Sequence, residues 1–214
     1  MDEFRQDFIR FAISQQALCF GNFKTKAGRI TPYFFNSGKI NDGNSLRELA
    51  TFYAKAIGAA AMEFDMLFGS AYKGIPLASA LAMYFAENGS PVPFCFNRKE
   101  AKDHGEGGEV VGASPAGRVL IVDDVISAGT SVRQSVRLIR AYGATPCGLV
   151  VALDRMEKGI GTLSAVEQVK AEFGIPVISV LTLRDLVAFL EVLPEYHAHL
   201  DAIRRYREQY GAAP

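Results

Sequence analysis

Between residues 66 and 181 the chain alternates short apolar runs with segments of helical periodicity. The apolar runs are residues 66–68, 93–96, 119–122, 148–153 and 177–181, and the helical patterns cover 75–87, 129–142 and a segment that begins near Ser164. Strands buried on both faces of a parallel sheet consist of continuous apolar residues, because neither face meets water. The pattern therefore predicts an α/β fold with a central, mostly parallel sheet and helices on both of its faces.

Shorter elements flank this alternating region. Residues 2–17 have apolar side chains at helical spacing, and the following Gly- and Lys-containing stretch indicates two short strands joined by a bend at Lys26. Ser45 and Glu48 have the spacing of a capping box, which predicts the start of a helix. Pro194 is expected to divide the C-terminal helical region, because proline cannot continue a helix.

The composition excludes several classes of protein. Hydrophobic residues make up 49% and charged residues 21% of the chain, which indicates a folded domain. Lys plus Arg equals Asp plus Glu at 23 each, so no net charge favours nucleic acid or an anionic membrane surface. No apolar run approaches the roughly 18 residues that span a bilayer. We expect one domain over residues 1–214, of which about 1–40 form a small N-terminal hood.

Three cysteines, Cys19, Cys95 and Cys147, are widely spaced and contain no CxxC pair. An odd number of separated cysteines supports neither a disulfide framework nor a zinc site. These side chains are expected to be thiols in a reducing compartment, which predicts a cytoplasmic protein.

The most informative stretch is RVLIVDDVISAGTS, residues 118–131, in which an apolar strand is followed by two acids and a small-residue loop that opens a helix. Backbone amides at a helix N-terminus bind a phosphate well, because they point outward and carry the positive end of the helix dipole. Asp123 and Asp124 do not suit a phosphate, but their carboxylates suit sugar hydroxyls or the water shell of a metal. Together these pieces predict a site for a sugar phosphate.

Two other interpretations of this stretch are open. Adjacent acids after an apolar strand also occur in receiver domains, where an acid accepts a phosphoryl group, although a SAGTS loop entering a helix does not suit that role. A purely structural strand-to-helix turn would explain Gly129 and a cap at Thr130. It would not explain why Asp123 stands beside Asp124.

The stretch resembles the signature of the type I phosphoribosyltransferases. This resemblance implies the fold of that family, 5-phosphoribosyl 1-pyrophosphate (PRPP) as the donor substrate and Mg²⁺ as the cofactor. It also implies that Asp123 and Asp124 hold the ribose and act in catalysis. The 5-phosphate would lie on Ser127, Ala128, Gly129, Thr130 and Ser131, and Val125 and Ile126 would also contact PRPP. Magnesium is expected to be held mainly by substrate oxygens and water, so no protein ligand is assigned.

Two further segments resemble one branch of that family, the bacterial orotate phosphoribosyltransferases. The first contains Lys26, which the resemblance places at PRPP, and Phe34 and Phe35, which it places beside orotate. Alternatively, Phe34 and Phe35 are core residues of a strand, in which only one of the two can face the core. The second is the loop of residues 69–74, in which Tyr72 and Lys73 resemble a pyrophosphate-binding pair. A lone lysine is otherwise most often simply solvated.

A third segment, residues 98–109, is polar and Gly-rich and is too long for a plain turn. Arg98, Lys99, Lys102 and His104 would close over the departing pyrophosphate, stabilise its charge and exclude water. We therefore expect a mobile active-site loop here, with Lys102 and His104 as catalytic residues. The other interpretation is a solvated loop in which acidic residues offset the bases.

The fourth segment contains Arg155, just after the run 148–153, where the resemblance places an arginine on the carboxylate of orotate. A guanidinium group matches a carboxylate with two hydrogen bonds and discriminates against bases without the acid. The alternative is an ion pair of Arg155 with Asp154 or Glu157. Ser127 is also expected to contact orotate, and it stands where the family more often has threonine.

The resemblance implies transfer of a phosphoribosyl group from PRPP to orotate, which gives orotidine 5′-monophosphate and pyrophosphate in pyrimidine (UMP) biosynthesis. It also implies a homodimer in which the active-site loop is shared between subunits, with no nucleic-acid or membrane partner. A phosphoribosyltransferase for another base would share the central motif. A non-catalytic, PRPP-sensing regulator would keep the fold without turnover.

Overall fold

The computed structural model describes residues 1–25, 28–102, 108–126, 129–159 and 161–212. In this part of the chain a six-stranded sheet has the order β5-β4-β3-β6-β7-β8, and β4, β3, β6, β7 and β8 run parallel while β5 is antiparallel to β4. The strands are β3 (Met66–Gly69), β4 (Phe94–Lys102), β5 (Gly108–Gly112), β6 (Arg118–Val122), β7 (Thr145–Asp154) and β8 (Val177–Thr182). The prediction of a mostly parallel sheet is confirmed.

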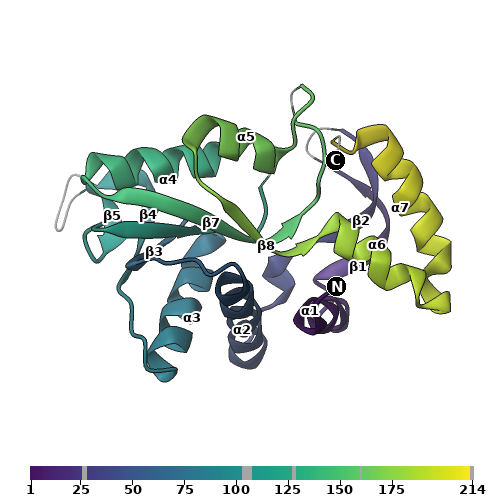
Figure 1. The fold of residues 1–214 in the computed structure, drawn as a ribbon, viewed down its shortest axis with the longest axis horizontal. Helices are drawn as coiled ribbons and strands as arrows, with labels where there is room; N and C mark the ends of the chain where they lie inside the picture. The colour runs from purple at the N-terminus through teal and green to yellow at the C-terminus, as the bar shows by residue number, and fades with distance from the viewer. Residues whose placement is uncertain (26–27, 103–107, 127–128, 160, 213–214) are drawn as a thin grey trace.

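Helices cover both faces of this sheet, as predicted (Figure 1). α2 (Gly43–Ala59) and α3 (Gly74–Glu87) lie on one face, and α4 (Thr130–Ala141) and α5 (Ala165–Phe173) lie on the other. The side chains between sheet and helices form two buried apolar clusters, so every central strand is covered on both sides. Within the described ranges, no helix combines the length and the apolar character needed to cross a bilayer.

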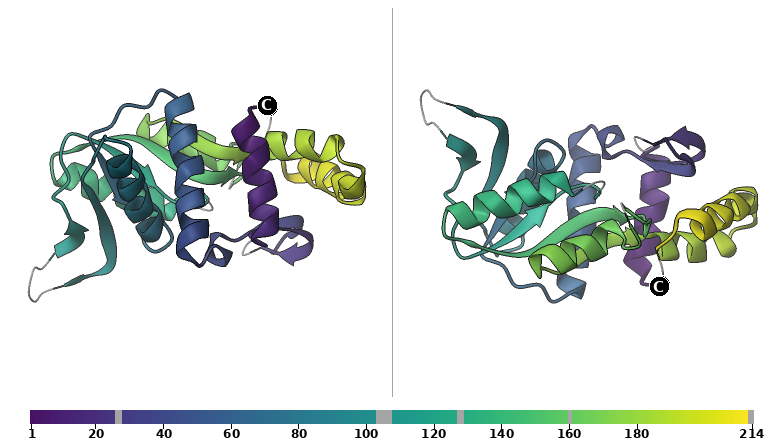
Figure 2. Two further views of the ribbon diagram at one scale, coloured as in Figure 1. Left: turned by 90° about the horizontal axis from the view of Figure 1, so that it is seen from below. Right: turned by 90° about the horizontal axis from the view of Figure 1, so that it is seen from above.

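A second, smaller layer lies beside the sheet at the β8 end (Figures 1 and 2). It contains α1 (Glu3–Ser14), the antiparallel strands β1 (Leu18–Lys24) and β2 (Ile30–Phe35), α6 (Leu183–Glu191) and α7 (His197–Tyr210). The ring of Tyr206 on α7 packs edge-on against Tyr33 of β2, at a centroid distance of 6.4 Å. The hood is therefore built from both ends of the chain, and not from the N-terminal elements alone.

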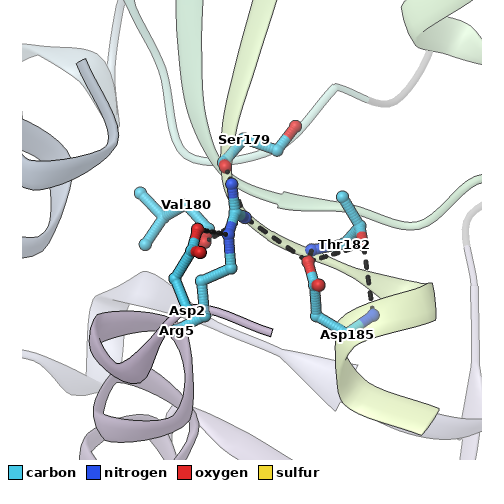
Figure 3. Close-up of polar contacts among 6 residues, drawn as sticks. All are labelled: Asp2, Arg5, Ser179, Val180, Thr182 and Asp185. Carbon is cyan, nitrogen blue, oxygen red and sulfur yellow. Dashed lines mark hydrogen bonds and ion pairs between the residues drawn. The ribbon is translucent and has the colours of Figure 1, made fainter. Parts of the chain in front are cut away.

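Arg5 ties the first helix of the hood to the edge of the central sheet (Figure 3). Its Nη1 donates to the carbonyl oxygens of Ser179 (3.1 Å) and Val180 (2.8 Å) on β8 and to Asp185 Oδ2 (3.3 Å) on α6. The same Asp185 carboxylate caps α6 through the backbone amide and hydroxyl of Thr182. One half-buried guanidinium group thus links α1 to β8 and α6, which lie 174 to 180 positions later in the sequence.

The predicted start of α2 is wrong. α2 begins at Gly43 rather than at Ser45, because Asp42 is the N-cap and accepts the amides of Asn44 (2.8 Å) and Ser45 (3.1 Å). An ionised carboxylate three residues earlier stabilises the helix start better than the serine hydroxyl does. The capping box at Ser164 is confirmed, as is the interruption at Pro194, where the 3-10 turn η2 (Pro194–Tyr196) separates α6 from α7.

The stretch 98–109 also differs from the predicted loop, because β4 continues to Lys102 and β5 already begins at Gly108. Asn97 pairs with Val110 and Lys102 with Gly108. The outer halves of the two strands project from the body of the domain (Figure 2). Residues 103–107 lie outside the described part of the chain, so the mobility of this segment stays a prediction.

Candidate active site

The candidate site lies at the carboxyl edge of the sheet, where β3, β6 and β7 end next to one another. Residues after the carboxyl ends of parallel strands line the ligand crevice of such folds. The loop after β3 lies directly on the end of β6, because the Ser70 amide donates to the Val122 carbonyl at 3.0 Å. A Cβ at Gly74 would overlap that same oxygen, and one at Gly69 would lie 2.6 Å from the Gly74 carbonyl. The two glycines therefore permit this close approach.

Asp123 is the buried member of the acid pair, with 7% of its surface exposed. Its Oδ1 accepts the Asp124 amide at 2.9 Å, and its Oδ2 accepts the Ser131 hydroxyl at 3.0 Å. The Tyr53 hydroxyl donates to its carbonyl oxygen at 2.9 Å. Burial, followed by the charge of Asp124, raises the pKa of Asp123 to about 6. In the absence of a ligand, ionisation of the Asp123 carboxyl group therefore costs more free energy than it would in water.

Asp124 is half-buried and belongs to a second network. Its Oδ1 accepts the Val125 amide at 2.8 Å, and its Oδ2 accepts the hydroxyl of Ser37 at 2.8 Å. Ser37 lies in the 3-10 turn η1 (Ser37–Lys39) after β2, and its oxygen in turn accepts Lys73 Nζ at 3.3 Å. The acid pair, the loop after β3 and the hood therefore meet at one hydroxyl group.

The loop between the acids and α4 ends at Gly129, which has a φ of 69°, in the left-handed region. Among the described residues, no side chain caps the N-terminus of α4 at its N-cap Gly129. Uncapped amides at a helix N-terminus suit an anion. Ser131 was expected to donate to phosphate, but here its hydroxyl is bonded to Asp123. Ser127 and Ala128 lie outside the described residues.

The structure separates the two phenylalanines of β2. Phe35 is 7% exposed and packs in the core with Phe8, at a ring-centroid distance of 6.2 Å. Phe34 is 43% exposed on the opposite side of the strand and stacks on Phe23 at 5.5 Å. The strand interpretation is therefore correct for Phe35, and only the ring of Phe34 is available to a planar ligand.

Arg155 lies in a half-buried cluster directly after β7. Its Nε donates to Glu157 Oε1 at 2.8 Å, its Nη2 donates to the Thr31 hydroxyl at 3.0 Å, and its guanidinium carbon lies 4.5 Å from the centre of the Tyr33 ring. Glu157 also lies 3.8 Å from Arg29 Nη1. The ion pair with Glu157 is thus present, and Asp154 instead accepts the Met156 amide at 2.8 Å. Two guanidinium groups share one carboxylate, which leaves one positive charge in excess.

The other expected site residues are placed only in part. Tyr72 is 63% exposed in the loop after β3, beside Lys73. Arg98 Nη1 donates to the Gly108 carbonyl at 3.2 Å across the β4–β5 pair. Lys99 and Lys102 lie on β4. Lys26 and His104 fall outside the described residues.

Three residues near the acids and Arg155 were not assigned a role from the sequence: Ser37, Tyr53 and Thr31. Ser37 contacts Asp124 across 87 positions of sequence, and Thr31 contacts Arg155 across 124. Thr31 and Tyr53 are also fully buried. No local pattern in the sequence marks such contacts. The one signal in the sequence was the position of Ser37 two residues after the aromatic pair, at the end of the segment 33–37.

Comparisons with known proteins agree with this geometry. Residues 36–171 match the family model described as the phosphoribosyl transferase domain. Proteins named orotate phosphoribosyltransferase from Chromobacterium violaceum and Nitrosospira multiformis are 63% and 61% identical to this chain, over 99% of it and 99% and 93% of their own lengths. The crystal structure of orotate phosphoribosyltransferase from Francisella tularensis superposes with a TM-score of 0.87 at 37% identity, over 96% of this chain and all of the other.

Proposed function

The chain belongs to the orotate phosphoribosyltransferases, within the phosphoribosyl transferase domain family, and from this premise we propose that it transfers the phosphoribosyl group of PRPP to orotate. The products are orotidine 5′-monophosphate and pyrophosphate, in the pathway to UMP. The observation that carries the proposal is that Asp123, Asp124 and Lys73 meet at the carboxyl edge of the sheet, beside an uncapped helix N-terminus.

For the donor, the proposal assigns one group of residues to each part of PRPP. The ribose hydroxyls donate to Asp123 and Asp124, whose free lone pairs suit hydroxyl donors. The 5-phosphate lies on the amides from Val125 to Ser131, at the start of α4. The pyrophosphate contacts Lys73, together with Tyr72 and Lys26.

For the acceptor, we propose that the exposed ring of Phe34 lies against the face of orotate and that main-chain atoms of Phe35 contact orotate beside it. Ser127 supplies a hydroxyl group to the base. Arg155 pairs with the carboxylate of orotate, which supplies the counter-charge that one glutamate shared by two arginines does not. Bases that lack this carboxylate would leave a half-buried positive charge uncompensated.

The reaction is a substitution at C1′ of the ribose. The ring nitrogen of orotate gives up its proton to solvent and forms the new C–N bond, while the bond from C1′ to the pyrophosphate oxygen breaks and its electron pair leaves with pyrophosphate. The configuration at C1′ is inverted. No covalent enzyme intermediate is required. Arg98, Lys99, Lys102 and His104 stabilise the negative charge that develops on the leaving group.

Magnesium is part of the proposal as the cofactor. Within the described residues, no three His, Cys, Asp or Glu side chains are grouped so as to hold a metal ion. Mg²⁺ prefers oxygen ligands and keeps several waters, so it fits a site in which PRPP supplies most ligands and the carboxylates of Asp123 and Asp124 accept hydrogen bonds from those waters. The ion neutralises charge on the pyrophosphate.

The proposal includes a cytoplasmic homodimer in which the segment 98–109 of one subunit reaches the site of the other. The free thiols of Cys19, Cys95 and Cys147 fit a reducing compartment. Small-molecule substrates are the expected partners, with neither nucleic acid nor a membrane.

The direct test follows the absorbance of orotate with PRPP and Mg²⁺ present, beside parallel reactions with uracil, adenine and hypoxanthine. We expect orotate to be consumed with release of one pyrophosphate, and the other bases to react at least a hundredfold more slowly. Turnover of a purine base instead would assign the chain to another acceptor. PRPP binding without turnover of any base would favour a regulator.

A further inference from the structure

The turn after β2 is shaped to hold an ammonium group. Asn36 Oδ1 accepts the Gly38 amide at 3.0 Å and so caps the turn, and the Asn36 amide donates to the Ala17 carbonyl at 2.7 Å. Lys73 Nζ lies against this turn, 3.4 Å from Asn36 Oδ1 and 3.3 Å from Ser37 Oγ. A Cβ at Gly38 would lie 2.7 Å from the same nitrogen. A side chain at this position would therefore push the Lys73 ammonium group away from the turn.

Ser37 connects this lysine to the acid pair. A serine hydroxyl has one hydrogen to donate and two lone pairs that accept. The hydrogen goes to Asp124 Oδ2 at 2.8 Å, so the lone pairs are left to accept from Lys73. Ser37 is only 9% exposed, which limits competition from water for both bonds. The direction of each hydrogen bond follows from the charges on either side.

In this arrangement the Ser37 hydroxyl bridges the Lys73 ammonium group and the Asp124 carboxylate. Within the described part of the chain, Lys73 contacts neutral oxygens and forms no ion pair with a carboxylate. A direct pair of Lys73 with Asp124 would have to be broken before either group could bind the donor, and removing one partner of a half-buried ion pair is costly. Exchange of a neutral oxygen for a pyrophosphate oxygen is favourable, because hydrogen bonds between charged groups are the stronger ones.

From this geometry we infer that Ser37 is a positioning residue for the donor: it orients the Asp124 carboxylate toward the ribose and holds Lys73 ready for the pyrophosphate. The inference rests on the proposed function and adds to it a residue of the hood that acts on PRPP rather than on orotate. The fold of the turn does not depend on the Ser37 hydroxyl, because the Asn36 side chain provides the cap.

The test compares Ser37→Ala with the wild type in steady-state kinetics and in PRPP binding measured by calorimetry without orotate. We expect Ser37→Ala to weaken PRPP binding and to raise its KM by about tenfold, the size of one lost hydrogen bond to a charged group. The KM for orotate should change less than twofold. Ser37→Thr, which keeps the hydroxyl, should recover most of the loss.

Two controls separate positioning from a damaged turn. Asn36→Ala removes the cap and should raise the KM of both substrates, whereas Ser90→Ala, an exposed serine far from the site, should change neither. An unchanged PRPP affinity in Ser37→Ala, or equal losses for PRPP and orotate, would overturn the inference. Failure of the wild type to consume orotate would instead refute the proposed function, and the calorimetric comparison with PRPP would still decide the role of Ser37.

Discussion

Asp123 and Asp124 are neighbours in the sequence but lie in different environments. Asp123 is buried and bonded to Ser131, while Asp124 is half-buried and bonded to Ser37. The strand-end motif made both acids predictable. Their partners were not predictable, because Ser37 comes from another part of the chain and because Ser131 had been assigned to phosphate.

The raised pKa of Asp123 predicts a pH dependence of stability. The folded pKa is about 6, whereas the unfolded pKa is about 3.9, so between these values the folded protein binds more protons. The free energy of unfolding should therefore fall as the pH rises from about 4 to about 6, with a contribution of about 3 kcal/mol from this group. Urea unfolding at pH 4.5, 5.5 and 6.5 measures this change.

Asp123→Asn provides the comparison, because asparagine has the same shape but does not titrate. The pH-dependent loss should be smaller in the variant than in the wild type by most of that amount. PRPP turnover should fall by orders of magnitude, because the ionised acceptor for ribose is gone. Parallel stability curves for the two proteins would contradict the assignment of the pKa to Asp123.

In the proposed function, the choice of base depends on Arg155. Arg155→Ala should lower kcat/KM for orotate by a hundredfold or more, since truncating one partner of a buried charged pair costs about 2–5 kcal/mol. The KM for PRPP should change little. Arg155→Lys keeps the charge but cannot donate two parallel hydrogen bonds to the carboxylate, and it should recover only part of the rate. Equal losses with orotate and uracil would show that Arg155 does not read the carboxylate.

At the scale of whole elements, the central strands followed from the sequence because burial on both faces requires continuous apolar runs. The outer half of β4 and the whole of β5 did not. The outer half of β4 projects from the body and carries polar residues such as Lys99 and Glu100, and β5 has only two apolar residues, Val110 and Val111. A strand held by pairing alone has no hydrophobic pattern. The start of α2 was misplaced for a different reason, because Asp42 competes with Ser45 as the cap.

The attachment of α1 to the sheet is an element-scale feature that a stability measurement can test. Arg5→Ala would leave the β8 carbonyls and Asp185 without their donor, and should lower the free energy of unfolding by about 2 kcal/mol. For a chain of this length, that loss lowers Tm by roughly 4–8 °C. Arg10→Ala is the matched control on the same helix.

The side chain of Arg10 is 58% exposed; it pairs with Asp7 and lies 5.3 Å from the centre of the Phe189 ring, and exposed contacts of these kinds each contribute at most about 1 kcal/mol. Thermal melts of the two variants should therefore differ clearly. If Arg5→Ala and Arg10→Ala had the same Tm, the Arg5 contacts in Figure 3 would not stabilise the fold.

At the scale of the molecule, the hood joins both ends of the chain beside the crevice. Lys158 donates its amide to the Tyr210 carbonyl at 2.9 Å, so the segment that follows Arg155 is fastened to the end of α7. Sequence periodicity predicted the C-terminal helices but not their position, because which elements pack together depends on contacts across the whole length. In the proposed function, the hood would provide one wall of the base site from residues at opposite ends of the chain.

The proposed sharing of the segment 98–109 between subunits can be tested by complementation. Lys102→Ala damages the segment that reaches across, and Arg155→Ala damages the site that receives it. In a re-equilibrated equal mixture, half of the dimers are hybrids in which one of two sites is intact, so about a quarter of the wild-type activity should return. Mixing Lys73→Ala with Arg155→Ala is the control, because both changes then lie in the same half-site and no hybrid has an intact one. If the mixture of Lys102→Ala and Arg155→Ala recovered no activity although hybrids formed, Lys102 would act in the site of its own subunit. Recovery in the control mixture would show instead that Lys73 and Arg155 belong to different half-sites.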